Sequence, residues 1–410
     1  MKLPRGHSLQ YVGFLLLIKL LSPALVSADL LSQGFTNITG SAERMISYRH
    51  QERFIITNDG SRHLLVNLGN RDSESKGALA LMQKIPGNTN WDEVIDFECT
   101  NETSTADMFL ENDQLHIVYT CEKQVWYASL NYDSVNTLWW DLKKRRIFRS
   151  FKQTPSAPTI AMGNNQTLHV VCTLTSLNKF VQLTGFSSSD PLLNWDTTSS
   201  WGTTNKRRAK AGRLLSLDSN VGLIYTDVSA DSNANYNSTL NFTRMSDDGS
   251  WSSPVILETT AASFHDPYGS HYSTSVDDQG NIHLIWPVEK RLKYYRYNHS
   301  SADWSSTFIL EFPHNSVYGQ VALHADGRIF LVYNIAKQMH VVESSDHGLN
   351  FMHTDFLVHS NENPLYDWAQ PRVETPALFH DTLEVLQQLS RLPTETEEAL
   401  ELLYLFTLRP

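Results

Sequence analysis

The sequence predicts an all-β protein, a seven-bladed β-propeller of four-stranded blades. A turn signal followed by an apolar-histidine-apolar strand recurs along the whole chain. Between the copies, residues alternate with period 2, aromatic and β-branched residues are common, and Gly, Asn and Asp mark the turns. A polar turn that ends in an aromatic residue also recurs in most units. A repeat of about fifty residues with four short strands is typical of a propeller blade.

The recurring strand is clearest in "NDGSRHLLV", "NDQLHIVY", "NQTLHVV" and "DQGNIHLIW". Successive copies are 53, 53, 53, 61, 47 and 54 residues apart, counted from the histidine position. Because each blade buries its faces against its neighbours, the spacing predicts one domain over residues 29–410. The seven aligned positions are His63, His116, His169, Gly222, His283, Phe330 and Glu384.

The repeated histidines occupy the same place in different blades, so they should be spread around the ring. We expect each to be buried on its strand and hydrogen-bonded to a neighbouring strand. No metal site and no cofactor are predicted.

An export signal is predicted at residues 1–28. Lys2 and Arg5 form a positive start, residues 12–21 an apolar core, and Val26-Ser27-Ala28 a cleavage site. The apolar core is too short to span a membrane. We therefore expect a secreted, extracellular protein without a membrane span. Asn-x-Ser/Thr sites predict a glycoprotein; they are Asn37, Asn101, Asn165, Asn237, Asn241 and Asn298.

The three cysteines predict one disulfide. Cys99 and Cys121 flank one predicted strand turn and are the expected pair, whereas Cys172, inside "LHVVCTL", is expected to be a buried free thiol.

The net charge is −11, and removal of the signal with Lys2, Arg5 and Lys19 makes it −14. This charge argues against nucleic acid or an anionic membrane as the main partner. Two basic runs, residues 143–146 and 206–208, run against this trend. Each is interpreted as a solvated loop or hairpin face, with a polyanion contact as the alternative.

One polar turn gives a specific resemblance. Ser344-Ser345-Asp346-His347-Gly348-Leu349-Asn350-Phe351 resembles the Asp-box of sialidase-like (BNR-repeat) propellers, and residues 188–195 and 246–251 are degraded copies. In such a turn, Asp and Ser side chains bind the backbone and the aromatic residue fills the space between sheets. The resemblance implies a secreted propeller near the glycan lyases and hydrolases of that fold.

The innermost strand of each blade should lie 9–15 residues before the histidine position and line a central funnel. Arginine binds carboxylates bidentately and aromatic faces stack on sugars, so a cationic, aromatic funnel suits an acidic glycan. The polar residues at or next to this offset are Arg49, His50, Thr105, Asp107, Thr154, Ser156, Lys210, Arg213, Tyr268, His271, Tyr272, Tyr318, Gln320, Trp368, Gln370 and Arg372. The expected substrate-binding residues are Arg49, His50, Lys210, Arg213, Tyr318, Trp368 and Arg372.

The segment before the fifth inner strand is the predicted catalytic loop. His265 and His271 are candidates for general base or acid, and Tyr268 and Tyr272 for a phenolic acid. The alternative is that His271 and Tyr272 only pack between blades. These residue types suit β-elimination at a uronate, in which Arg49, Arg213 and Arg372 would neutralise the carboxylate.

Sialidases of the resembled family use an arginine triad, a Tyr–Glu nucleophile pair, an Asp acid and a Phe/Tyr-Arg-Ile-Pro segment. Here the comparable place reads Tyr48-Arg49-His50 or Arg53-Phe54-Ile55-Ile56, without proline, and the Tyr–Glu pair has no clear position. A uronate lyase is therefore favoured over a sialidase-type hydrolase. A non-catalytic lectin or adhesion propeller and a protein-interaction scaffold are the competing classes. An enzyme requires His or Tyr where arginines converge, whereas a lectin would show several equivalent shallow sites, one per blade.

Overall fold

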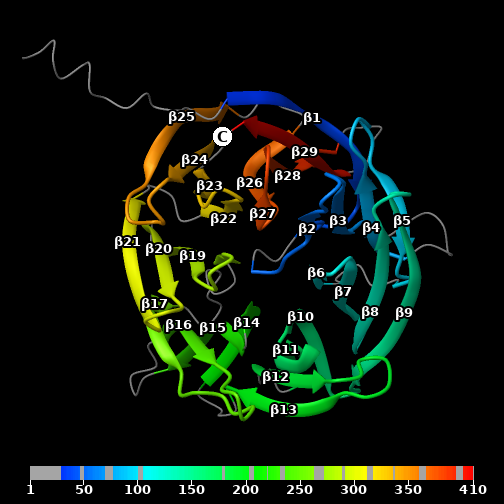
Figure 1. Ribbon diagram of the computed structural model, residues 1–410, viewed down its shortest axis with the longest axis vertical. Helices are drawn as coiled ribbons and strands as arrows, with labels where there is room; N and C mark the ends of the chain where they lie inside the picture. The colour runs from blue at the N-terminus through cyan, green and yellow to red at the C-terminus, as the bar shows by residue number, and fades with distance from the viewer. Residues whose placement is uncertain are drawn as a thin grey trace, which may run out of the picture.

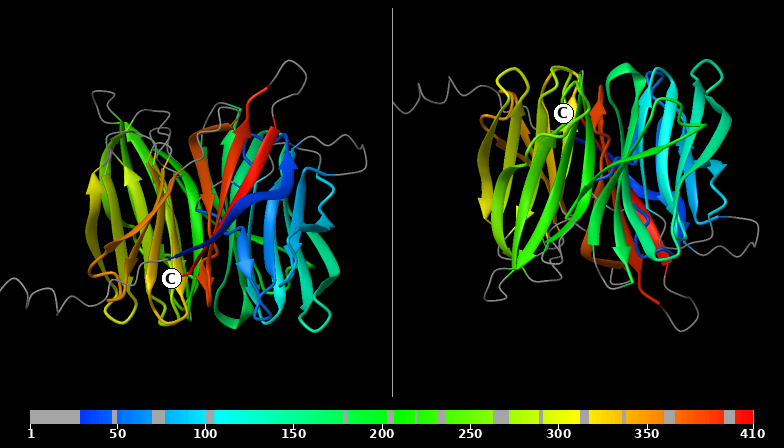
Figure 2. Two further views of the ribbon diagram at one scale, coloured as in Figure 1. Left: turned by 90° about the horizontal axis from the view of Figure 1, so that it is seen from above. Right: turned by 90° about the horizontal axis from the view of Figure 1, so that it is seen from below.

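The structure is a computed structural model that describes residues 29–46, 50–69, 77–99, 105–177, 181–202, 207–218, 220–230, 236–262, 272–288, 291–311, 317–335, 338–359, 366–393 and 400–409. Seven sheets are arranged in a ring, which confirms the predicted seven-bladed propeller, and we call the centre of the ring the channel (Figure 1). In side view the strands run along the axis of the ring (Figure 2).

Each blade is a meander whose first strand lies nearest the channel. The first four blades are β2–β5 (Phe54–Ile56, Arg62–Asn67, Leu79–Lys84, Asp92–Asp96), β6–β9 (Ala106–Glu111, Gln114–Cys121, Gln124–Asp133, Leu138–Arg149), β10–β13 (Gln153–Met162, Leu168–Ser176, Val181–Ser188, Asp196–Trp201) and β14–β17 (Arg207–Leu217, Asn220–Ala230, Tyr236–Arg244, Val255–Ala262). The fifth and sixth are β18–β21 (Ser273–Val276, Ile282–Val288, Arg291–Asn298, Asp303–Glu311) and β22–β25 (Val317–His324, Ile329–Ile335, Gln338–Ser344, Met352–His359). A short 3-10 turn, η1 (Asn164–Gln166), joins β10 to β11.

The seventh blade closes the ring. It consists of β26 (Tyr366–Glu374), β28 (Leu383–Arg391), β29 (Leu400–Arg409) and, as its outer strand, β1 (Asp29–Gly40). The pairing of β1 with β29 runs from Asp29 opposite Arg409 to Gly40 opposite Glu401 (Figure 1). The short strand β27 (Leu378–Phe379) leaves this blade and pairs in parallel with β22 of blade six.

The hydrophobic core lies between adjacent blades. Between blades two and three, for example, Val118 and Tyr127 pack with Ile160, Val170 and Phe186, all nearly inaccessible to solvent. Each blade thus has two buried faces, and the blades form one continuous domain.

All four repeated histidines are buried on the second strands, as expected, and His63, His116 and His283 are hydrogen-bonded to neighbouring side chains. His116 Nδ1 lies 2.8 Å from the Tyr127 hydroxyl, and His283 Nδ1 lies 2.6 Å from that of Tyr294. His63 Nδ1 accepts a hydrogen bond from the Trp139 indole at 3.0 Å. Burial lowers the pKa of His63 to about 3, so this imidazole is neutral at physiological pH.

Cys99 and Cys121 form the predicted disulfide, with their Cα atoms 5.6 Å apart. Cys172 is a free, buried thiol, and burial raises its pKa. The Ser344–Phe351 turn is closed by Asp346, whose carboxylate accepts hydrogen bonds from Ser344 Oγ at 2.8 Å and Asn350 N at 2.9 Å. Phe351 then packs edge-on against Tyr294 of the preceding blade, with ring centroids 4.8 Å apart.

The expected glycosylation sites differ in exposure. Asn37, Asn165 and Asn237 are exposed, and Asn298 is half-buried. Asn241 is 5% exposed and its amide donates to Thr239, so a glycan there would require a change in side-chain conformation. Asn101 lies outside the described residues. No helix in the described part of the chain is long and apolar enough to cross a membrane.

Candidate functional site in the central channel

Part of the chain that belongs to the first blade crosses the channel. Leu65 N donates to Arg53 O and Asn67 N donates to Met45 O, so positions 53 and 45 both contact β3. Between them, residues 50–52 leave the sheet; we call these three residues the channel plug (Figure 1). The chain therefore interrupts the inner edge of its own first blade to fill the centre of the ring.

Residues of the channel plug contact three other blades. Gln51 Nε2 donates to Pro158 O of blade three at 2.5 Å, and Glu52 O accepts from Met108 N of blade two at 3.1 Å. The His50 ring stacks on Tyr272, next to blade five, with centroids 5.5 Å apart. His50 and Gln51 are 1% and 3% exposed, so the plug is part of the packed interior.

Polar side chains join the inner strands around the ring. Asp107 Oδ2 accepts from Ile160 N at 3.0 Å, and Ser273 Oγ accepts from Val321 N at 3.2 Å. Thr159 Oγ1 likewise accepts from Leu214 N at 3.0 Å. In each case a side chain of one inner strand binds the backbone of the next. Nine or ten residues before the histidine positions, the seven blades carry Arg53, Asp107, Thr159, Arg213, Ser273, Gln320 and Glu374.

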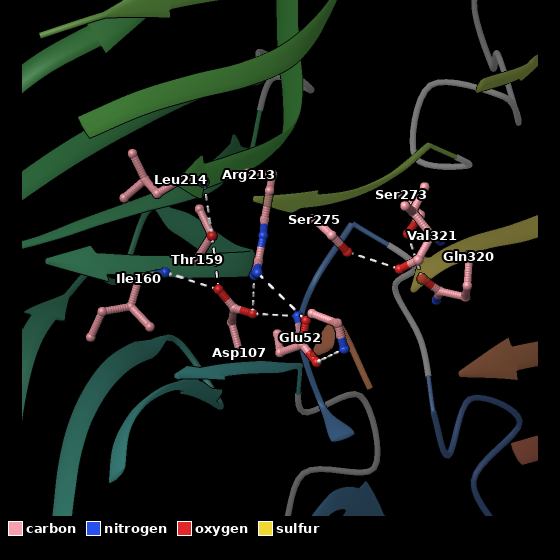
Figure 3. Close-up of polar contacts among 11 residues, drawn as sticks. Glu52, Asp107, Thr159, Ile160, Arg213, Leu214, Ser273, Ser275, Gln320 and Val321 are labelled. Atoms are coloured by element: carbon pink, nitrogen blue, oxygen red, sulfur yellow. Dashed lines mark hydrogen bonds and ion pairs between the residues drawn. The ribbon is translucent and has the colours of Figure 1, made fainter. Parts of the chain in front are cut away.

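Arg213 spans two blades to form a buried ion cluster (Figure 3). Its Nη1 donates to Asp107 Oδ1 at 2.5 Å, and its Nη2 lies 3.8 Å from Glu52 Oε2. Asp107 Oδ1 also accepts from the backbone N of Glu52 at 2.5 Å. The residue of the intervening blade, Thr159, is small, and its hydroxyl donates to Asp107 Oδ2 at 2.8 Å. The cluster thus ties blades two, three and four to the channel plug.

Burial sets the protonation of this cluster. It raises the pKa of Glu52 from 4.5 to about 8, although Arg213 opposes the shift and Asp107 adds to it. Burial also raises the pKa of Glu374 well above its ordinary value, and nearby Glu52 contributes. Burial lowers the pKa of Arg213, but the adjacent Asp107 carboxylate outweighs this effect, so the pKa is raised overall. At neutral pH, Glu52 therefore holds its proton beside a charged guanidinium.

Tyr272 is oriented into the seam between blades four and five. Its hydroxyl donates to Ala211 O and, at 3.1 Å, to Ile224 O. The residue is fully buried, and burial raises its pKa well above 10. These contacts fit the packing role that the sequence left open, and they do not fit a phenol that reaches a substrate.

The remaining predicted residues divide into two groups. Lys210 is half-buried on β14, and Arg372 on β26 donates to Glu43 O and pairs with the Glu43 carboxylate at 3.6 Å. The structure thus brings His50, Arg213 and Tyr272 together, whereas Arg372 contacts Glu43. Four other predicted residues lie outside the described residues: Arg49, His265, Tyr268 and His271. For two more, Tyr318 and Trp368, the backbone is described and the side chain is not.

Sequence reasoning missed Glu52, Arg53 and Glu374. All three fall in the predicted offset window, 9–15 residues before the histidine position. Their signal was therefore present, but the carboxyl groups of Glu52 and Glu374 did not fit a funnel expected to be cationic, and Arg53 entered only the comparison with the sialidase segment.

A pocket of about 570 Å³ reaches the ion cluster from the end of the channel where the inner strands finish. Glu52 and Arg213 line it, together with apolar side chains such as Met108 and Phe109 and the rim residue Asp113. The side chains of Glu52 and Arg213 are each 11% exposed. Among the described residues, no three His, Cys, Asp or Glu side chains are grouped to hold a metal ion.

No protein-family model and no curated protein matches this sequence. Among solved structures, the chain is similar to the polysaccharide lyase Uly1, with a TM-score of 0.52 and 10% identity over 94% of both chains. It also resembles a Trypanosoma rangeli sialidase (TM-score 0.45, 8% identity, 91% of this chain and 58% of that one). A third is the SapL1 lectin in complex with alpha methyl fucoside (TM-score 0.44, 9% identity, 76% and 97%).

At these identities the likeness shows the fold alone. Of these three, only the likeness to the polysaccharide lyase Uly1 has a TM-score above 0.5, and it concerns the overall fold.

Proposed function

We propose that this protein is a secreted enzyme that cleaves a glycan at an acidic sugar, by β-elimination at a uronate. One observation carries the proposal. The seven equivalent channel positions hold six different residue types, with charged residues in blades one, two, four and seven. A lectin with one site per blade would repeat its contact residues, whereas this asymmetry supports a single site.

The cations of the channel supply the electrostatic part of the reaction. Both terminal nitrogens of Arg213 interact with carboxyl groups, so Arg213 acts as a fixed positive charge. Lys210, three residues earlier on β14, and Arg49 are assigned to the substrate carboxylate. Neutralising that carboxylate stabilises the carbanion that forms when the adjacent C5 proton leaves.

The segment before Tyr272 supplies the proton transfers. His271 takes the C5 proton, the C4–O bond breaks, and the electron pair of the C5–H bond becomes the new C4–C5 double bond. The leaving oxygen is protonated by Tyr268, with His265 as a second acid candidate. Tyr272 is a positioning residue, because its two backbone hydrogen bonds fix the end of this segment.

The test is incubation of the purified protein with a 4-linked polyuronate and, separately, with sialylated oligosaccharides. We expect ultraviolet absorbance from an unsaturated uronate that is lost in His271→Ala and kept in His347→Ala. His347 is a suitable control because it lies in the β24–β25 turn and is not among the residues that line the pocket beside Glu52 and Arg213. Released sialic acid without new absorbance would indicate a hydrolase instead.

Glycan binding without cleavage is the second candidate. It is favoured by the state of Arg213 and Tyr272, whose polar groups are already engaged within the protein. Binding of the polyuronate without any product, at several pH values, would refute the enzyme proposal and support this one.

A further inference from the structure

The outer strand of blade two carries an unusual concentration of positive charge. β9 pairs only with β8, so its other edge lies at the circumference of the ring (Figure 1). Residues 143–152, "KKRRIFRSFK", contain six cations and no acid, in a chain with 33 basic and 44 acidic residues. Lys123 adds to this surface, since its Nζ donates to Phe151 O at 3.5 Å. We call this surface the basic edge: Lys123, Lys143, Lys144, Arg145, Arg146, Arg149 and Lys152.

The outer strands of the other six blades have a different composition. β1, β5, β13, β17, β21 and β25 contain no lysine or arginine at all. Three of the five residues of β5 are acidic. Edge strands commonly carry lysine or other charges that prevent pairing with another chain. Protection against pairing with another chain does not explain the basic edge, because the outer strands of the other six blades contain no lysine or arginine.

The positive charge is only partly neutralised. Lys143 pairs with Asp141 at 2.7 Å and Lys144 with Glu98 at 3.1 Å. Arg145 donates to a carbonyl, Leu193 O, at 2.6 Å. In the described part of the chain, no carboxylate lies within ion-pair distance of Arg145, Arg146 or Arg149. Seven cations and two paired acids leave a net charge of +5 on the basic edge.

The cations follow one exposed strand, with successive side chains on opposite faces: Lys144 reaches Glu98 next to blade one, and Arg145 reaches Leu193 of blade three. Arg145, Arg146 and Arg149 are all exposed, and at about 3.3 Å per residue the strand extends ~20 Å from Lys143 to Arg149. Large aromatic side chains flank this line: Trp140 is 53% exposed and Phe151 is 74% exposed. Guanidinium groups bind sulfate and carboxylate bidentately, and aromatic faces stack on sugar rings.

We propose that the basic edge is a binding site for a polyanionic glycan, a chain with sulfate or carboxylate groups on successive sugars. The export signal predicted from the sequence makes an extracellular polyanion, and not nucleic acid, the expected partner. The basic edge lies on the outside of the ring, whereas the inner strand of the same blade lines the channel (Figure 1). The two proposals can therefore fail independently.

The probe is heparin, with dextran as a neutral glycan and duplex DNA as a polyanion of another class. We expect heparin binding whose Kd rises at least about tenfold between roughly 50 and 200 mM salt, because each contact displaces counterions. The variant Arg145→Gln/Arg146→Gln/Arg149→Gln should weaken binding at least about tenfold for the same reason.

The matched control is Arg44→Gln/Lys84→Gln/Arg409→Gln, which removes the same charge from the segment 41–46, β4 and β29. It should change heparin affinity by less than about twofold. Equal losses in both variants, or no heparin binding, would overturn the proposal. So would DNA binding that is as tight as heparin binding and equally sensitive to the basic-edge variant. The variant Arg145→Gln/Arg146→Gln/Arg149→Gln should leave the ultraviolet absorbance change with the 4-linked polyuronate as it is in the native protein, which separates this result from the channel chemistry.

Discussion

Glu52 is a buried acid, and the stability of the propeller should depend on its protonation. Its pKa is raised from 4.5 to about 8 by burial, with Asp107 adding and Arg213 opposing. A raised pKa means that the folded state holds a proton which the unfolded chain releases at neutral pH. The stabilisation is therefore complete below about pH 4.5 and is lost as the pH rises through about 8.

Glu52→Gln keeps the shape of the side chain and removes this titration. At about 1.4 kcal/mol per pH unit, the linkage of Glu52 amounts to about 4 kcal/mol between pH 5 and pH 9. Between pH 5 and pH 9, we expect the free energy of unfolding to fall by about 4 kcal/mol more in the native protein than in Glu52→Gln. The two proteins should thus be similar at pH 5, and the variant should be the more stable at pH 9.

The assay is urea unfolding followed by tryptophan fluorescence at a series of pH values. Glu311→Gln is the control, because Glu311 is exposed at the end of β21. Its pH profile should overlay that of the native protein. Parallel profiles for the native protein and Glu52→Gln would refute the argument, since they would mean that Glu52 titrates equally in the folded and unfolded states.

Three further predictions concern the same core. Arg213→Met should cost about 3–5 kcal/mol of unfolding free energy, because it leaves the Asp107 carboxylate buried without its cation. Adding Asp107→Asn should recover part of this loss. Equal losses in the single and the double variant would contradict this prediction. Tyr272→Phe should cost about 1–2 kcal/mol in urea unfolding, since Ala211 O and Ile224 O lose a donor. Cys99→Ser/Cys121→Ser removes a crosslink of sequence separation 22 and should lower the free energy of unfolding by about 3 kcal/mol in the same assay. An unchanged free energy of unfolding would mean that the two cysteines are reduced in the native protein.

Much of the channel could be predicted from the sequence. The repeat interval set the blade number, and the offset from the histidine positions located the inner strands. That offset brought His50, Arg213 and Tyr272 into one group, and the structure places these three side chains together. Periodicity was sufficient because the side chains of a strand alternate with period 2 and the blades repeat a common register.

The roles of those residues could not be read from the same pattern. The spacing places Asp107 and Arg213 in blades two and four, but it does not show that one side chain crosses blade three to reach the other. Nor does it show that residues 50–52 leave the first blade and fill the channel. Arg213 was therefore expected to be available for a ligand and is instead paired with Asp107.

The sequence by itself determined the blades, the disulfide partners and the strands that face the axis, because local spacing specifies strand register and turns. The tertiary structure alone decided that β1 closes the ring on β29, that the channel is plugged, and that Glu52 keeps its proton. These properties arise from distances between segments that are far apart in the chain, and from the loss of water around a carboxyl group when seven blades close around it.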